Sequence, residues 1–246
     1  MTSPRPCALV PTYDNPRTVR RVVERIRAHL PDVIVVDDGS GDAGRREVEA
    51  LERDGLARAV RRERNGGKGA AVKDGLRAAR DLGFTHALQI DADGQHEIED
   101  VPRFLAAARA DPGALVLGCP VFDASAPRSR LRGRLFSRFW TDLETAGRCI
   151  ADPLCGFRVY PVERALRAGA CADRMAFDVE IAVRMVWGGC RTVNLPTRVR
   201  YLTADEGGVS HFRMFRDNVE ISWCHTRLCT AALLRIVTGR RLRPPR

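Results

Sequence analysis

Short apolar runs alternate with segments of helical spacing along the first half of the chain. Residues 7–10 form one such run, and residues 33–36 form a continuous Val-Ile-Val-Val stretch typical of a strand covered on both faces. Between them, apolar residues recur with the period of an amphipathic helix, at Val19, Val22, Val23, Ile26 and Leu30. The pattern therefore predicts a strand, a helix and a second, fully buried strand.

The same alternation continues to about residue 117. Further helices are predicted up to Leu51, over 68–82 and over 101–110, with strands near 56–60, at 87–90 and at 114–117. This order favours an α/β fold with an open, mostly parallel sheet and helices on both faces. No repeat or linker composition interrupts it, so we expect a single domain over 1–246. Because ligands of such sheets bind at the carboxyl ends of the strands, the loops there are the places to look for chemistry.

The loop after the second strand carries two adjacent carboxylates, in the sequence Asp37-Asp38-Gly39-Ser40. Carboxylates at a strand end can accept hydrogen bonds from a base N–H group and from ribose hydroxyls. The same residue types also favour turns and helix caps, so this loop alone leaves both interpretations open.

A glycine-rich loop, Asn65 to Gly69, opens the helix predicted over 68–82. Its glycines let backbone approach a ligand closely, and a helix N-terminus with Lys68 favours an anion. It is not a P-loop, because Arg62 stands where the first glycine should be and Gly69 follows the lysine. Nor does it match a dinucleotide-binding fingerprint. A turn that opens the helix and binds no ligand is the alternative interpretation.

The third loop, Asp91-Ala92-Asp93-Gly94-Gln95-His96, follows the strand that ends at Ile90. Two carboxylates one residue apart, beside the amide oxygen of Gln95, suit a hard divalent ion that also binds diphosphate oxygens. An EF-hand is excluded, because its sixth position would be His96 and its twelfth Pro102. As the third polar loop at a strand end, this motif predicts a ligand site at that edge of the sheet.

Taken together, five motifs resemble a family 2 glycosyltransferase of the GT-A fold, most closely the branch of dolichyl-phosphate mannose synthase. They cover residues 7 to about 160 and are Pro11-Thr12-Tyr13, Val36-Asp37-Asp38-Gly39-Ser40, Asn65-Gly66-Gly67-Lys68-Gly69, Asp91-Ala92-Asp93-Gly94-Gln95-His96 and Gly156-Phe157-Arg158. The resemblance implies an enzyme that moves one sugar from a nucleoside-diphosphate sugar to an acceptor, with Mg²⁺ or Mn²⁺ and with inversion. It makes a lipid or polyprenyl phosphate a candidate acceptor.

The resemblance also implies a donor site. Its residues would be Pro11, Tyr13, Asp37 and Asp38 at the nucleoside, Lys68 in the glycine-rich loop, Asp91 at the ribose, and Asp91, Asp93 and Gln95 at the metal, with Asp93 among the catalytic residues. One departure concerns the donor base. The family usually has Asn-Glu after Pro-Thr-Tyr, whereas this chain has Asp14-Asn15, so UDP and GDP both stay open.

For the acceptor, the resemblance points to arginines and a serine after the strand at 114–117. We expect Arg128, Arg132 and Ser137 to hold an acceptor phosphate, with Arg132 in a catalytic role, although the same spacing also fits a solvated helix. If the acceptor is an alcohol, Asp152 would be its general base, whereas a phosphate acceptor needs no base. A structural role of Asp152 as a cap is the third interpretation.

Other acceptor-half candidates rest on the same resemblance. They are Arg158 beside the acceptor, Asp178 and Glu180 at the start of a helix, and Arg200, His211 and Arg213 in a loop that closes on the diphosphate. Negative charge in a first helical turn explains the acidic pair equally well, and His211 equally suits a helix cap. We expect a nucleotide-sugar half over 1–120, an acceptor half over 121–215, and a C-terminal helix with a basic tail over 216–246.

Charge adds one question about partners. The net charge is +10, and only Lys68 and Lys73 are lysines, so arginine supplies nearly all the positive charge. We do not expect nucleic acid as partner, because aromatic residues are few and do not alternate with basic ones. The apolar stretch 221–237, followed by a basic tail, predicts either a core helix or a helix on an anionic membrane surface.

Cysteine usage and the N-terminus concern the compartment. The eight cysteines lack zinc or disulfide spacing, and no signal peptide or run of about 18 apolar residues is present. We therefore expect a cytoplasmic protein, or one peripheral on the cytoplasmic face of the membrane. Two rival functions are a silent nucleotide-sugar-binding protein and a sugar-1-phosphate nucleotidyltransferase, the second disfavoured because Pro11-Thr12-Tyr13 replaces a glycine-rich loop.

Overall fold

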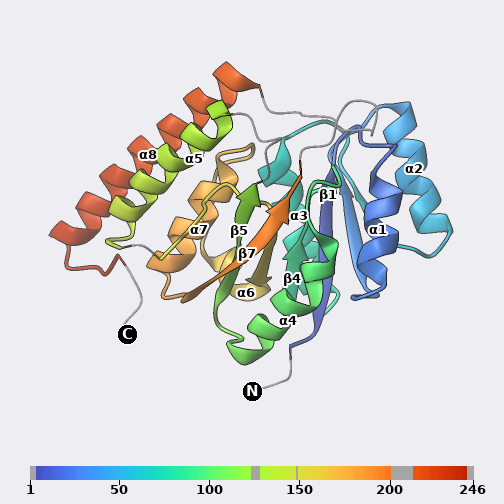
Figure 1. Cartoon of the computed structure of the whole chain (residues 1–246), viewed down its shortest axis with the longest axis horizontal. Coiled ribbons are helices and arrows are strands. Elements are labelled where there is room, and N and C mark those ends of the chain that lie inside the picture. Colours follow the sequence, from blue (N-terminus) through green and yellow to red (C-terminus); the bar gives the residue numbers. More distant parts are fainter. Residues whose placement is uncertain (1–3, 123–127, 148, 201–212, 243–246) are drawn as a thin grey trace.

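The computed structural model describes residues 4–122, 128–147, 149–200 and 213–242 (Figure 1). The strands are β1 (Pro6–Thr12), β2 (Val33–Asp37), β3 (Arg58–Arg61), β4 (His86–Gln89), β5 (Leu115–Phe122), β6 (Arg158–Pro161) and β7 (Thr192–Val199). The helices are α1 (Val19–Arg27), α2 (Asp42–Arg53), α3 (Lys68–Asp81), η1 (Ile98–Asp100), α4 (Val101–Ala110), α5 (Arg128–Glu144), α6 (Val162–Arg167), α7 (Phe177–Trp187) and α8 (Met214–Val237).

The strands form one sheet in the order β3-β2-β1-β4-β6-β5-β7. All neighbouring pairs are parallel except those of β6, which runs antiparallel to β4 and β5. The predicted α/β fold with a mostly parallel sheet is therefore confirmed. The sequence pattern did not predict β6, because it has four residues and begins with the charged Arg158.

Alternation along the strands divides the core into two clusters, one on each face of the sheet. In β1, Cys7 and Leu9 pack with α3 and α7, whereas Ala8 and Val10 pack with α1 and α4. A strand with apolar side chains on both faces needs a helical layer on each side. This explains why the apolar runs of the first half are continuous rather than alternating.

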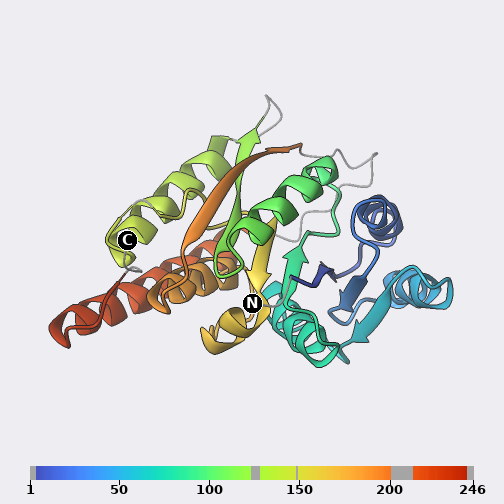
Figure 2. The ribbon, with the colours of Figure 1, turned by 90° about the horizontal axis from the view of Figure 1, so that it is seen from below.

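Two long helices form an outer layer at the C-terminal side of the sheet. α8 packs against α5 and α7, and Figure 2 shows α5 and α8 side by side, on the opposite side of the molecule from α1 and α2. A buried contact joins the pair, since His225 Nδ1 lies 2.8 Å from Glu144 Oε1. Within the ranges given above, no helix combines the length and the apolar character that crossing a bilayer requires.

Candidate active site

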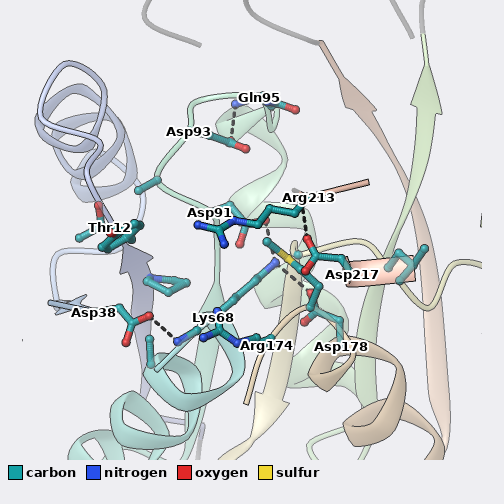
Figure 3. Close-up of a pocket in the computed structure, with 18 of the residues that line it drawn as sticks. Thr12, Asp38, Lys68, Asp91, Asp93, Gln95, Arg174, Asp178, Arg213 and Asp217 are labelled. Atoms are coloured by element: carbon teal, nitrogen blue, oxygen red, sulfur yellow. Dashed lines mark hydrogen bonds and ion pairs between the residues drawn. The ribbon is translucent and has the colours of Figure 1, made fainter. Parts of the chain in front are cut away.

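A pocket of about 490 Å³ opens where the carboxyl ends of β1 and β4 meet the N-terminal ends of α3, α7 and α8. This volume falls in the usual range for small-molecule sites, roughly 300–1,000 Å³. The sequence-predicted residues that line it are Pro11, Tyr13, Asp38, Lys68, Asp91, Asp93, Gln95, Asp178 and Arg213. The three predicted strand-end loops thus meet in one cavity (Figure 3).

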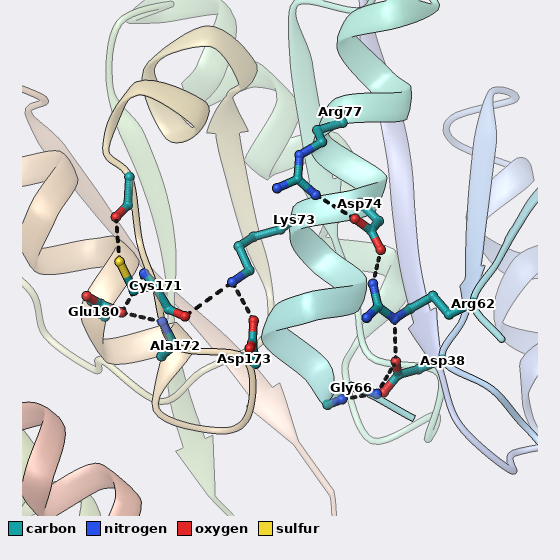
Figure 4. A network of polar contacts seen from close by, with 12 residues as sticks. Asp38, Arg62, Gly66, Lys73, Asp74, Arg77, Cys171, Ala172, Asp173 and Glu180 are labelled. Atoms are coloured by element: carbon teal, nitrogen blue, oxygen red, sulfur yellow. Dashed lines mark hydrogen bonds and ion pairs between the residues drawn. The ribbon is translucent and has the colours of Figure 1, made fainter. Parts of the chain in front are cut away.

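Asp38 holds the glycine-rich loop against the end of β2. Its two carboxylate oxygens accept hydrogen bonds from the backbone N–H groups of Gly66 at 2.9 Å and Gly67 at 2.7 Å. Arg62 forms an ion pair with the same carboxylate at 2.9 Å and also contacts Asp74 on α3 (Figure 4). Burial raises the pKa of Asp38, and the two amides and Arg62 partly oppose that rise. Its carboxylate therefore fixes the position of the loop that forms this side of the pocket.

The glycines of this loop are required by contact with the segment before α7. Gly67 has a φ of +98°, and a Cβ at that position would overlap the backbone oxygen of Asp173. The N–H of Ala70 donates to the same oxygen at 2.9 Å. The start of α3 can approach this segment because Gly67 and Gly69 carry no side chain.

Lys68 lies at the centre of the pocket between two carboxylates. Its Nζ is 2.8 Å from Asp91 Oδ2 and 2.9 Å from Asp178 Oδ2, so it connects the loop after β4 to the first turn of α7. Burial alone would lower the pKa of this ammonium, but Asp178 and Asp91 outweigh burial and raise it. A Cβ at Gly156 would overlap both Asp91 and Lys68, so the pair also depends on a glycine from the loop before β6.

Asp91 and Asp93 bear opposite pKa shifts. Burial would raise the pKa of Asp91, but Lys68 and the His96 ring hold it well below its usual range. The pKa of Asp93 is raised by burial and then by the negative charge of Asp91. Asp93 therefore bears a charge that the neighbouring groups only partly compensate.

The loop from Asp91 to Gln95 fits a divalent cation that takes its remaining ligands from a bound substrate. Asp91 Oδ1 is buried without a hydrogen-bond partner, and the N–H of Gln95 donates to Asp93 Oδ1 at 3.0 Å. In the part of the chain that the structure describes, no cluster of three His, Cys, Asp or Glu side chains can hold a metal. Two carboxylates with an amide oxygen match Mg²⁺ or Mn²⁺ sites whose remaining ligands are water and phosphate oxygens.

Four arginines also line the pocket, and we call this set the arginine wall. They are Arg134, Arg174, Arg213 and Arg216. In Figure 3, the Arg213 side chain extends across the pocket toward Asp91. Glu220 partly balances the set, since Arg216 Nε donates to it at 3.2 Å and Arg174 Nε lies 4.0 Å away. The acidic wall is the set of four lining carboxylates, Asp38, Asp91, Asp93 and Asp178.

Only Arg213 of the arginine wall was among the sequence-predicted site residues. The pocket also contains residues that the sequence did not single out, among them Thr12, Asn15, Asn65, His96, Arg134, Arg174, Arg216 and Asp217. Thr12, Asn65 and His96 belong to the five sequence motifs, so their position in the motifs could have identified them as site residues. The three missed arginines come from α5, α8 and the segment before α7, and sequence spacing gave no sign that these would meet.

Asp152 does not line the pocket. Its carboxylate accepts two hydrogen bonds from Arg134 Nη1, both at 2.7 Å, and one from the N–H of Leu154 at 2.8 Å. The carboxylate is thus engaged by an arginine that does line the pocket. The bonds of Asp152 to Arg134 and to a backbone N–H two residues on therefore suit a group that orients this arginine.

Several other predicted residues are not brought to the pocket. Arg158 is fully buried and donates to the backbone oxygens of Cys155, Pro153 and Asp178 at 2.6–2.7 Å, so it ties the loop before β6 to α7. Glu180 is buried too, and its Oε2 accepts hydrogen bonds from the N–H groups at positions 171 and 172. Both side chains are engaged by backbone groups of the interior, as buried polar groups usually are, and they hold neighbouring segments together.

The remaining candidates lie near the pocket or outside the described residues. Asp37 accepts a hydrogen bond from the N–H of Ser40 at 3.0 Å, as a turn residue does, and Ser137 is buried in α5. Arg132 is exposed on α5, and Arg200 is exposed next to Gln95, whose backbone oxygen accepts its N–H. Arg128 begins α5, but its side chain, like the whole of His211, lies outside the described part.

Sequence comparison decides the family. Residues 7–162 match the family described as Glycosyl transferase family 2, which covers more than half of the chain. The chain belongs to this family. It is therefore a glycosyltransferase, as the motifs predicted.

Named relatives of this family 2 glycosyltransferase include two bacterial enzymes. An undecaprenyl-phosphate mannosyltransferase of Micrococcus luteus is 29% identical over 208 residues, which cover 78% of this chain and 82% of the relative. A polyprenol monophosphomannose synthase of Mycolicibacterium smegmatis is 28% identical over 222 residues, which cover 84% of this chain and 80% of the relative. These relatives support the predicted resemblance to the dolichyl-phosphate mannose synthase branch.

Solved structures confirm the GT-A fold of this family 2 glycosyltransferase. Glucosyl-3-phosphoglycerate synthase of Mycobacterium tuberculosis, in complex with Mn²⁺, UDP and glucosyl-3-phosphoglycerate, superposes with a TM-score of 0.66. The match covers 92% of this chain and 80% of that one, at 19% sequence identity. At this identity the likeness concerns the fold alone.

Proposed function

We propose that this glycosyltransferase moves a sugar from a nucleoside-diphosphate sugar to a polyprenyl phosphate, with inversion and with a divalent metal. The observation that carries the proposal is one pocket lined by both the acidic wall and the arginine wall. The names of the relatives add the acceptor class, since both bacterial enzymes are named for polyprenyl-phosphate substrates or products.

The acidic wall suits the donor. Pro11, Tyr13 and Asn65 line the pocket together with Asp38 and suit a nucleoside, while Asp91, Asp93 and Gln95 line it from the loop after β4. Mg²⁺ or Mn²⁺ held there would neutralise the diphosphate as it leaves the sugar. Lys68 holds the Asp91 carboxylate in its charged form and in one orientation, through the 2.8 Å contact.

The arginine wall suits two anions, the donor diphosphate and the acceptor phosphate. In this proposal Arg213, which extends toward Asp91, contacts the diphosphate, whereas Arg134, which is bonded to Asp152, contacts the acceptor. The planar guanidinium binds phosphate oxygens with two parallel hydrogen bonds. An acceptor phosphate held by Arg134 would present an oxygen that attacks the anomeric carbon from the side opposite the leaving diphosphate.

A phosphate acceptor also agrees with the position of Asp152. A phosphate oxygen is already anionic and needs no general base, whereas an alcohol acceptor does. Because the Asp152 carboxylate is bonded to Arg134 and to the N–H of Leu154, it is occupied in orienting the arginine. The engaged state of this carboxylate therefore favours phosphate over alcohol among the two acceptor classes.

The test is a transfer assay with purified protein, Mn²⁺ and radiolabelled UDP- and GDP-sugars. A short-chain polyprenyl phosphate, the matching polyprenol and 3-phosphoglycerate serve as the three acceptors. We expect product only with the polyprenyl phosphate, and only while the metal is present. Transfer to 3-phosphoglycerate or to the polyprenol, but not to the polyprenyl phosphate, would contradict the proposed acceptor.

A further inference from the structure

The exposed large apolar side chains of the molecule are concentrated on two helices. Among the described residues there are twelve of them, and all except Val121 lie on α5 and α8. Isolated exposed apolar residues are normal on a protein surface, but a concentration on adjacent elements marks an interaction site. We call this set the α5–α8 surface.

On α5 the usual distribution of side chains is reversed. The helix buries the polar residues Ser137 and Thr141, while Phe136, Phe139 and Leu143 are exposed by 51–57%. A surface helix in contact with water normally presents its polar residues outward. The solvent-facing side of α5 is therefore suited to a non-aqueous environment.

α8 is apolar on two opposite sides. One stripe, which includes Ile221 and Leu228, is buried against α5 and α7. On the other side, Phe215, Val219 and Trp223 recur every four residues and are exposed by 85%, 52% and 62%. Residues four apart share one face of a helix, so these three form a continuous outward stripe.

The α5–α8 surface begins at the rim of the pocket. Gly133 and Arg134 of α5 and Asn218 and Ile221 of α8 line the cavity, and the exposed apolar residues follow on the same helices. Figures 1 and 2 both show the two helices running side by side. A flat apolar partner lying on these helices would therefore border the opening of the pocket.

Positive charge borders the same surface. Arg132 on α5, Arg216 on α8, and Arg240 and Arg241 just after α8 are all exposed. Arginine beside an apolar helical face attracts an anionic lipid surface. A second copy would instead bring the same arginines close to one another, which opposes association.

We propose that the α5–α8 surface rests on an anionic phospholipid bilayer, so that the pocket receives its acceptor from the plane of the membrane. The apolar side chains enter the interfacial region, and the bordering arginines contact lipid headgroups. The part of this inference that concerns the acceptor rests on the proposed function. The contact with the bilayer depends only on the surface of the two helices.

The experiment is sedimentation of the purified full chain with vesicles of phosphatidylcholine, with and without phosphatidylglycerol. Wild-type protein is expected to pellet with the anionic vesicles and much less with the neutral ones. The double variant Phe139→Ser/Trp223→Ser should lose about tenfold or more of its partitioning. The matched control is Val121→Ser, which removes an apolar side chain of 54% exposure outside the surface and should bind as wild type does.

Fluorescence of Trp223 gives a second readout. Its emission should shift to shorter wavelength on adding anionic vesicles, and Trp223→Phe should keep the binding while losing that part of the shift. Equal pelleting of wild type and the double variant would overturn the proposal. So would a stable dimer in solution that the double variant converts to monomer, because the surface would then be an interface between copies.

Failure of this inference can be separated from failure of the proposed function. With a short-chain polyprenyl phosphate dissolved in detergent-free buffer, the double variant should transfer sugar at the wild-type rate, because Phe139 and Trp223 are not pocket residues. Loss of vesicle binding with retained transfer supports the docking surface. Retained vesicle binding in the double variant overturns it, whatever the transfer rate.

Discussion

The two walls of the pocket differ in how their charges are held. In the acidic wall, Asp38 and Asp91 are buried or partly buried and are bonded within the scaffold, to loop amides and to Lys68. In the arginine wall, Arg174 and Arg216 are 37% and 48% exposed and share Glu220 at 3.2–4.0 Å. Asp38 and Asp91 are thus preorganised by the core, whereas Arg174 and Arg216 can adapt to an anion that enters.

The difference follows from where the side chains originate. The acidic wall comes mostly from loops directly after strands of the central sheet, whose positions are fixed by the ladder of hydrogen bonds. Arg134 and Arg216 come from α5 and α8, which pack as an outer layer, whereas Arg174 and Arg213 come from the segments before α7 and α8. We therefore expect a substitution that breaks a bonded pair of the acidic wall to affect both stability and donor use. Substitutions in the arginine wall should affect substrate use alone.

Lys68→Met should have the largest effect. The variant removes the cation shared by Asp91 and Asp178 and leaves two carboxylates close together without it, which costs about 3–5 kcal/mol when one partner of a buried pair is lost. Transfer should also be lost. Urea unfolding and transfer rates measure the two effects, with the more exposed Lys73→Met as the matched control. A stability within about 0.5 kcal/mol of wild type would refute the central role of Lys68.

Asp93→Asn should abolish most transfer while leaving the fold intact. The substitution removes one charge from the pair that would hold the metal, and several kcal/mol of charge stabilisation correspond to at least about 100-fold in rate. The asparagine keeps the size of the side chain and relieves repulsion by Asp91, so the free energy of unfolding should not fall. Asp81→Asn, at the exposed end of α3, is the control. A fully active Asp93→Asn variant would contradict the assignment of Asp93 to a metal site.

Asp152→Asn should have a smaller effect, confined to the acceptor. If Asp152 acts only by orienting Arg134, the variant should lose about 10–100-fold in kcat/KM for the acceptor, by analogy with outer partners of metal ligands. The double variant Asp152→Asn/Arg134→Gln should then be little worse than Arg134→Gln alone. Strictly additive losses, with a pH dependence that disappears in Asp152→Asn, would instead indicate a general base.

Strand-end reasoning predicted the acidic wall well. Val33 to Val36 could only be a buried strand, and its carboxyl end placed Asp38 at the edge where Asp91 also emerges. The spacing of the motifs along the chain was sufficient because each loop directly follows a strand. The same reasoning placed Asp37 beside Asp38, although its carboxylate turns back to the N–H of Ser40.

The arginine wall and the outer helices could not be predicted in the same way. Arg134 and Arg132 lie on the same helix two residues apart, and the tertiary packing of α5 decides which of them reaches the pocket. Arg158 and Glu180 looked like site residues because charged side chains in motifs often are, yet both satisfy backbone groups in the interior. Apolar residues occur on opposite sides of α8, so the sequence does not reveal which of them, such as Trp223, are exposed.

The acceptor KM of Arg134→Gln tests the division between the walls most directly. Initial transfer rates would be measured while the nucleotide sugar and the polyprenyl phosphate are varied separately, for wild type and for the variant. The account predicts that the KM for the acceptor rises about tenfold or more while the KM for the donor stays within about twofold of wild type. An equal rise of both values, or a rise for the donor alone, would contradict the assignment of this arginine to the acceptor phosphate.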